Sequence, residues 1–163
     1  MSVPITLFIA GLADSLLLGL DDLSAALIST AIFAPIIEEF SKIFPLYYRH
    51  GETQRSIMRL ALAVGLGFGL VEMLTYVAVL GIGIPFRLPG LLFHPASTAI
   101  AAYGIATKKP LPYYALAVAL HFTNNFLAIF NPVPFISVSV IMVAVTVWIA
   151  WSLYHKTKET FIT

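Results

Sequence analysis

Apolar residues occur in six long runs along the chain, and short segments of polar or turn-forming residues separate these runs. A membrane-spanning helix needs about 20 mainly apolar residues, so each run is long enough for one span. The pattern predicts an all-α fold, a polytopic membrane helix bundle of about six transmembrane helices. The predicted spans cover residues 3–20, 23–48, 57–83, 88–107, 111–130 and 134–154.

The composition agrees with a membrane protein. Of the 163 residues, 60% are hydrophobic and 10% are charged, whereas a soluble domain has about 25% charged residues. We expect one membrane-embedded domain over residues 1–163, because no separator is long enough to divide the chain. The chain has no cysteine, which excludes disulfides, thiolate metal sites and a cysteine nucleophile. The net charge of +1 gives no indication of a nucleic-acid partner.

The basic residues predict the orientation, because Lys and Arg concentrate in cytoplasmic connections. With six spans, Arg87 and Lys42 are the two exceptions among the nine Lys and Arg residues, and both termini should be cytoplasmic. We expect a multi-pass protein in the plasma membrane of a prokaryote. The first run has no basic start and is interrupted by Asp14, so it is predicted to be a retained helix and not a signal peptide. The residues that fall on the cytoplasmic side are Arg49, Arg55, Arg59, Lys108, Lys109, Lys156 and Lys158.

Two glutamates and a lysine interrupt the second run: Glu38, Glu39 and Lys42. A charged side chain at the bilayer centre costs about 2.5–3.5 kcal/mol, so such residues are rarely found there without a function. Glu38 and Lys42 are four residues apart, share a helix face and are predicted to form an ion pair. Pro35 removes a backbone hydrogen bond just before the glutamates, which predicts a kink next to them.

The third run carries a face of small residues, Ala61, Gly65 and Gly69, at four-residue spacing. Faces of this kind let membrane helices approach each other closely. Glu72 lies three residues beyond Gly69 on the same face. Glu72 is therefore predicted to point into the bundle and away from lipid.

Histidines interrupt the fourth and fifth runs, in the patterns His94-xxx-Thr98 and His121-xxx-Asn125. In each pattern the two polar residues share a helix face. Pro95 predicts either a kink or a helix that starts there, with His94 just outside it. At 1.5 Å per residue, the histidines and the three glutamates fall on both sides of the bilayer midplane. One polar cavity could hold the whole set.

The sequence lacks the catalytic motifs of several other classes of intramembrane protease. The sequence has no GxSG motif and no HExxH motif, and its only aspartates are Asp14, Asp21 and Asp22. The nucleophile is therefore expected to be water, activated by a carboxylate or a metal ion. Two other classes stay open, a non-catalytic membrane scaffold and a proton-coupled transporter. Adjacent buried glutamates argue against the scaffold, and the lack of a visible inverted repeat argues against the transporter.

The order of these motifs resembles the PrsW family of intramembrane proteases, in the wider group that includes CAAX prenyl endopeptidases, bacteriocin-processing enzymes and the gamma-secretase subunit APH. The resemblance covers about residues 34–128. Lys42 and Glu72 favour the PrsW branch, since the CAAX branch typically has Arg one position later and His in place of Glu72. The motifs that carry it are Glu38-Glu39-x-x-Lys42, Phe68-xxx-Glu72, His94-xxx-Thr98 and His121-xxx-Asn125.

The resemblance implies hydrolysis of peptide bonds in membrane-associated substrates, for example an anti-sigma factor. By this resemblance Glu38 or Glu39 is the general base on a water, and His121 with Asn125 orients the water or donates to the oxyanion. Lys42 would hold the glutamate pair, and Glu72 and His94 would complete the site, with Thr98 in support. The scaffold alternative would then be of the APH type.

A metal remains the second possibility for activating the water. Two histidines with carboxylates form a plausible zinc set. We expect no cofactor, because no compact metal-ligand motif appears. If the site does bind zinc, the expected ligands are His94, His121, Glu72 and Glu39.

Overall fold

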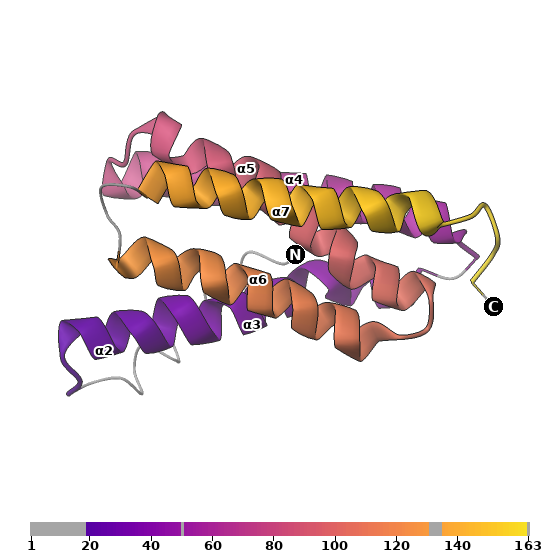
Figure 1. Ribbon diagram of the computed structural model, residues 1–163, viewed down its shortest axis with the longest axis horizontal. Helices are drawn as coiled ribbons and strands as arrows, with labels where there is room; N and C mark the ends of the chain where they lie inside the picture. Colours follow the sequence, from indigo (N-terminus) through magenta and orange to yellow (C-terminus); the bar gives the residue numbers. More distant parts are fainter. Residues whose placement is uncertain (1–18, 50, 131–134, 163) are drawn as a thin grey trace.

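The computed structural model describes residues 19–49, 51–130 and 135–162 of the chain (Figure 1). The predicted first span lies outside these residues, apart from Gly19 and Leu20, and so does Asp14. The described part of the chain is a bundle of helices, and the all-α prediction is confirmed.

The second predicted span is built from four consecutive helical segments. They are α2 (Asp22–Ala26), the π-helix η1 (Leu27–Phe33), α3 (Ala34–Ile43) and the short 3₁₀ helix η2 (Phe44–Tyr48). The later spans are single helices: α4 (Gln54–Leu80), α5 (Ile84–Ala106), α6 (Pro110–Phe130) and α7 (Phe135–Lys156). Their ends lie within four residues of the predicted boundaries.

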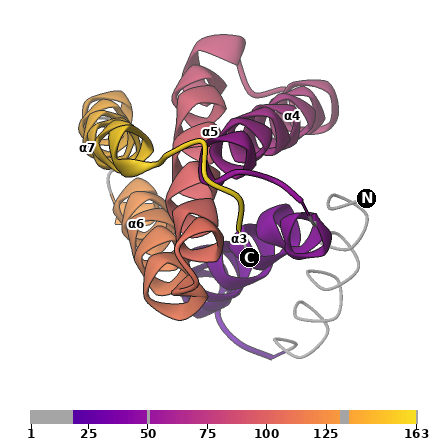
Figure 2. The same cartoon turned by 90° about the vertical axis from the view of Figure 1, so that its right-hand side faces the viewer.

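Four helical segments of the described residues are long and apolar enough to cross a membrane. They cover Leu23–Tyr48, Gln54–Val79, Pro110–Phe130 and Ser139–Lys156. Helix α5 has a comparable length of 23 residues, but it lies in the middle of the bundle, between α4 on one side and α6 and α7 on the other (Figure 2). The protein is thus a membrane helix bundle with α5 at its centre.

The small residues of α4 let it pack closely against α5, as predicted. Ala61 is fully buried. A Cβ atom placed on Gly65 would lie 2.5 Å from the His94 carbonyl oxygen, and one on Gly69 would lie 3.3 Å from the His94 ring. The two backbones therefore approach each other at His94, and no side chain larger than hydrogen fits at position 65 without moving a helix.

The prolines act differently in the two helices that carry them. Before Pro35 the chain is a π-helix, and α3 starts at Ala34 with Pro35 in its first turn. The regular backbone is therefore interrupted beside the glutamates, as predicted. Pro95 lies inside α5, so the alternative that a helix starts there is wrong. His94 is within the helix and its side chain is buried.

The C-terminal residues return to the start of α4. Thr53 and Phe161 form an isolated antiparallel bridge, and the Gln54 N–H donates to the Thr160 carbonyl at 3.0 Å. Figure 1 shows the end of α7 and the connection between α5 and α6 at the same end of the molecule. The described segments predicted to be cytoplasmic, residues 51–56, 107–110 and 156–162, thus share one end of the bundle.

Candidate active site

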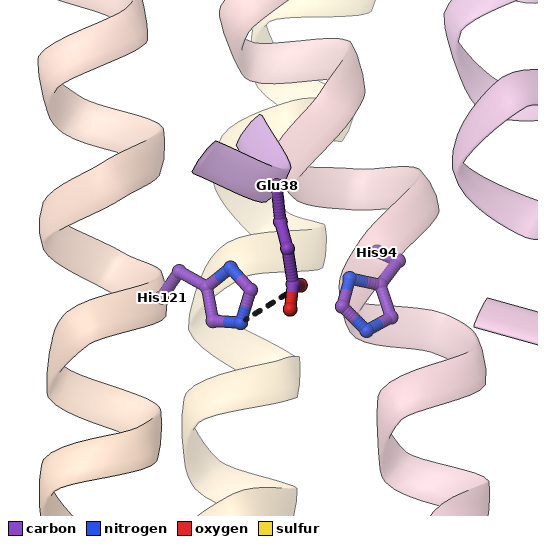
Figure 3. A group of neighbouring side chains, drawn as sticks. All are labelled: Glu38, His94 and His121. Carbon is purple, nitrogen blue, oxygen red and sulfur yellow. Dashed lines mark ion pairs between the residues drawn. The ribbon is translucent and has the colours of Figure 1, made fainter. Parts of the chain in front are cut away.

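Polar side chains from α3, α4, α5 and α6 meet inside the bundle. They adjoin a cavity of about 480 Å³ whose lining also includes residues of η1 and α7. Figure 3 shows Glu38 reaching from α3 into the space between His121 and His94. The predicted site residues that line the cavity are Glu38, Glu72, His94, His121 and Asn125.

Glu39 forms the buried centre of this cluster and does not line the cavity. Its Oε1 atom accepts three hydrogen bonds, from Lys42 Nζ at 2.6 Å, from His121 Nδ1 at 2.8 Å and from Ser97 Oγ at 3.0 Å. The side chains of Glu39 and Lys42 are both fully buried. A buried ion pair needs such additional hydrogen bonds to offset the loss of water. Glu39 therefore holds three helices together through one carboxylate oxygen.

The ion pair of Lys42 differs from the sequence prediction. Lys42 pairs with Glu39, three residues away, and not with Glu38, four residues away. Both spacings place side chains on one helix face, so the neighbouring helix decides between them. Lys42 Nζ also contacts His94 Nδ1 at 3.1 Å and Ser97 Oγ at 3.4 Å, and these contacts hold the ammonium group on the α5 side.

The contacts of His94 fix its tautomer. The Lys42 ammonium group has only hydrogens to offer, so His94 Nδ1 must accept. His94 Nε2 then carries the proton and donates to Glu72 Oε2 at 2.6 Å. Both ring nitrogens of His94 are occupied. The Thr98 hydroxyl donates to the His94 carbonyl oxygen at 2.7 Å, which is a backbone contact and not part of the cavity wall.

His121 donates from the other ring nitrogen, Nδ1, whereas His94 donates from Nε2. The Nδ1–H of His121 donates to Glu39, so in the neutral ring Nε2 carries a lone pair, and this atom faces Glu38 Oε2 at 3.8 Å (Figure 3). That distance is too long for a direct hydrogen bond. Glu38 Oε2 is buried and has no hydrogen-bond partner within the described residues. Two acceptors thus face each other across a gap, which suits a water molecule or a cation.

Asn125 reaches the cavity, but its amide has a contact elsewhere. Its Nδ2 donates to the carbonyl oxygen of Thr30 in η1 at 2.9 Å. In a π-helix that carbonyl would accept from the residue five positions later, which is Pro35, and proline has no N–H. Asn125 therefore replaces a missing backbone donor and fixes the segment that leads to Glu38.

Sequence reasoning missed two residues of the cluster, Ser97 and Arg87. Ser97 bonds to Glu39, and its spacing of three residues from His94 could have indicated it. Arg87 Nη2 pairs with Glu72 Oε1 at 2.8 Å. The sequence pattern places Arg87 in a connection, because the predicted span starts at residue 88, whereas α5 starts at Ile84.

The donor set partly fits a metal ion. Glu38, His94 and His121 each offer one ligand atom within 4.8 Å of the others. The carboxylate of this set is therefore Glu38, whereas the sequence analysis expected Glu39 and Glu72 as the carboxylate ligands. Zinc binds such atoms at about 2.0–2.2 Å, so two of its ligands lie at most about 4.4 Å apart. The 3.8 Å between Glu38 and His121 fits. His94 would have to release a hydrogen bond to become the third ligand, because both of its ring nitrogens have partners.

Comparison with models of protein families matches residues 1–151 to the family described as PrsW family intramembrane metalloprotease. This match extends beyond the motif-bearing residues 34–128 at both ends. No curated protein and no solved structure matched the chain.

Proposed function

Because the chain belongs to the PrsW family of intramembrane proteases, we propose that it hydrolyses peptide bonds of membrane-anchored proteins with a water molecule held between Glu38 and His121. One observation carries the proposal. The buried Glu38 Oε2 atom has no partner among the described residues and faces the lone pair of His121 Nε2 at 3.8 Å inside the cavity. A water oxygen about 2.8 Å from each atom would donate one hydrogen to each.

Glu38 is the general base in this proposal. It accepts a proton from the water as the water oxygen bonds to the substrate carbonyl carbon. His121 accepts the second hydrogen of the water and thereby orients its lone pair. The protonated Glu38 then gives the proton to the departing amide nitrogen as the carbon–nitrogen bond breaks. Atoms and charges balance without another reactant.

Glu39 has a different role from its neighbour. It is fully buried, outside the cavity, and accepts the Nδ1–H of His121. A carboxylate in this position selects the tautomer of a histidine and fixes its ring. Lys42 and Ser97 hold the same oxygen of Glu39. We therefore assign Glu39, Lys42 and Ser97 to positioning His121, and Glu38 to the reaction itself.

If the protein binds a metal ion, Glu38 and His121 would hold it, with His94 as the third ligand after a rearrangement. The ion would supply a bound water of lowered pKa and a Lewis acid for the carbonyl oxygen. In that case Glu39 keeps its place, because a histidine that ligates a metal usually donates its other N–H to a carboxylate.

The orientation of the site follows from the predicted topology. With cytoplasmic termini, the ends of α4 and α6 and the starts of α5 and α7 lie toward the outer face. The cavity lining includes residues of all these segments, among them Tyr76, Phe86, Arg87, Ile129 and Ser139. We propose that the substrate reaches Glu38 from the outer half of the membrane, with a peptide segment that has left its helical form.

The test is cleavage of synthetic single-pass membrane peptides by the purified, reconstituted protein. Glu38→Gln should abolish cleavage, because glutamine cannot accept the proton, and Glu39→Gln should lower it by at least tenfold. The control is Glu159→Gln, an exposed glutamate outside the cluster, which should cleave like wild type. Full activity of Glu38→Gln would refute its role as base. A wild-type protein that cleaves no membrane peptide would favour the scaffold or the transporter.

A further inference from the structure

Arg87 is a partly buried cation that the proposed reaction does not use. It lies in the first turn of α5, with a side chain that is 20% exposed. Its Nη2 atom is 2.8 Å from Glu72 Oε1, and its guanidinium carbon lies 3.8 Å from the ring centroid of Tyr76. Arg87 thus contacts α4 twice, through an ion pair and through a cation–π contact.

Glu72 is shared between Arg87 and His94. Its Oε1 atom pairs with Arg87, and its Oε2 atom accepts the Nε2–H of His94 at 2.6 Å. Arg87 and His94 are seven residues apart, about two turns on one face of α5. Gly90 lies between them, and a Cβ atom there would be 3.9 Å from Glu72 Oε2. The carboxylate therefore lies across Gly90, held at both ends.

A carboxylate held by His94 alone could rotate. The Glu72 carboxyl group lies at the end of a flexible side chain, and a neutral histidine supplies it with one hydrogen bond and no charge. The guanidinium group of Arg87 adds a cation and a second, charge-assisted contact at the other oxygen. Together the two contacts define the plane of the carboxylate and the direction of the Oε2 lone pair.

We propose that Arg87 is a positioning residue that acts through Glu72 to hold the ring of His94, in its Nε2–H tautomer, in place. In that tautomer His94 Nδ1 accepts from Lys42 at 3.1 Å, and Lys42 in turn holds Glu39, the partner of His121. Arg87 thereby links the wall of the cavity to the residues beside Glu38. The consequence for cleavage rests on the proposed function, whereas the effect on His94 does not.

The tautomer can be measured without a substrate. Nitrogen NMR of protein labelled with ¹⁵N-histidine distinguishes a protonated from an unprotonated ring nitrogen, and His94→Gln identifies the His94 signals by their loss. Wild type should show His94 protonated at Nε2 only. Arg87→Met should shift the Nε2–H signal of His94, because Glu72 can then turn away from it, and Arg87→Lys should restore most of the wild-type signal. The matched control Arg59→Gln removes an exposed arginine and should change nothing.

If Arg87→Met does not fold, a second pair of variants keeps the test decisive: Glu72→Leu alone and Glu72→Leu combined with Arg87→Met. The double variant removes both charges together and leaves neither unpaired. Glu72→Leu should disturb the His94 signals, and adding Arg87→Met to it should cause no further change. An additional change in the double variant would show that Arg87 acts on His94 by another route. A folded Arg87→Met protein with wild-type His94 signals would overturn the proposal outright.

Kinetics separate positioning from substrate contact. Loss of a positioning partner typically costs about 10–100-fold in activity, so Arg87→Met should lower kcat by at least tenfold and leave KM unchanged. A raised KM with an unchanged His94 spectrum would mean that Arg87 touches the substrate, and would contradict the proposal. If wild type cleaves no peptide, the proposed function fails, but the NMR result for Arg87 still decides its role.

Discussion

Gly65→Ala tests the close contact between α4 and α5 on which the site depends. The added Cβ atom would lie 2.5 Å from the His94 carbonyl oxygen and from Pro95 Cα. Ordinary contacts between carbon atoms are about 3.5–4.0 Å, so the two helices must separate by about 1 Å. Both contact atoms belong to the backbone, so no side-chain rotation relieves the overlap.

The same separation would damage the polar cluster. The bond between His94 Nε2 and Glu72 Oε2 joins α5 to α4 at 2.6 Å, and an opening of about 1 Å would extend it to about 3.6 Å, beyond hydrogen-bond length. Overpacking of this kind costs about 1–3 kcal/mol. For a protein of this size, that lowers the melting temperature by about 2–12 °C.

Gly67→Ala is the matched control, because it changes the same residue type on the same helix. No atom lies within 4 Å of a Cβ placed on Gly67, and alanine is the better helix former by about 0.8–1.0 kcal/mol. Thermal unfolding in detergent should show Gly65→Ala melting below wild type, with Gly67→Ala at or above it. Equal melting temperatures for the two variants would refute the packing argument.

Three further predictions follow from the site and the topology. Lys42→Met should destabilise the fold by about 3–5 kcal/mol, because Glu39 keeps its buried charge; the double variant with Glu39→Leu should melt higher than Lys42→Met alone. Elemental analysis should find less than one zinc per chain, and chelators should leave cleavage intact; one zinc per chain, lost in Glu38→Gln or His121→Ala, would show a metalloprotease. The chain has no cysteine, so single cysteines can be introduced to test the topology. Cysteines at three positions should label only from the cytoplasmic side, and cysteines at two positions only from outside. Labelling from the opposite side at two or more positions would refute the topology. The cytoplasmic positions are Ser56, Lys109 and Thr160, and the outer positions are Leu20 and Gly83.

The helices and their close contacts were predictable because they depend on local patterns. The apolar runs gave the described helices to within four residues. The spacing of Ala61, Gly65 and Gly69 correctly identified the face of α4 that packs on α5 and the inward direction of Glu72. Each of these predictions rests on the spacing of residues within a single helix and requires no information about the neighbouring helices.

The partners within the cluster were not predictable in the same way. Helix geometry allows Lys42 to reach either glutamate, and the choice is made by His94 and Ser97 on α5. The contact of Asn125 with Thr30 depends on a π-helix, which no spacing rule would indicate. Which glutamate enters the cavity was therefore left open by the sequence, since it follows from contacts between helices.

The ion pairs Glu39–Lys42 and Glu72–Arg87 also bear on how the chain enters the membrane during synthesis. Glu39 and Lys42 lie within one helix, and Glu72 and Arg87 lie in two consecutive helices joined by a short turn. Glu39 thus meets its counter-ion within one helix, and Glu72 waits only for the next helix, α5. Glu38 differs, because the residue with which it forms an ion pair, His121, arrives only with α6. The group that waits longest for this partner is the one that we propose holds the reacting water.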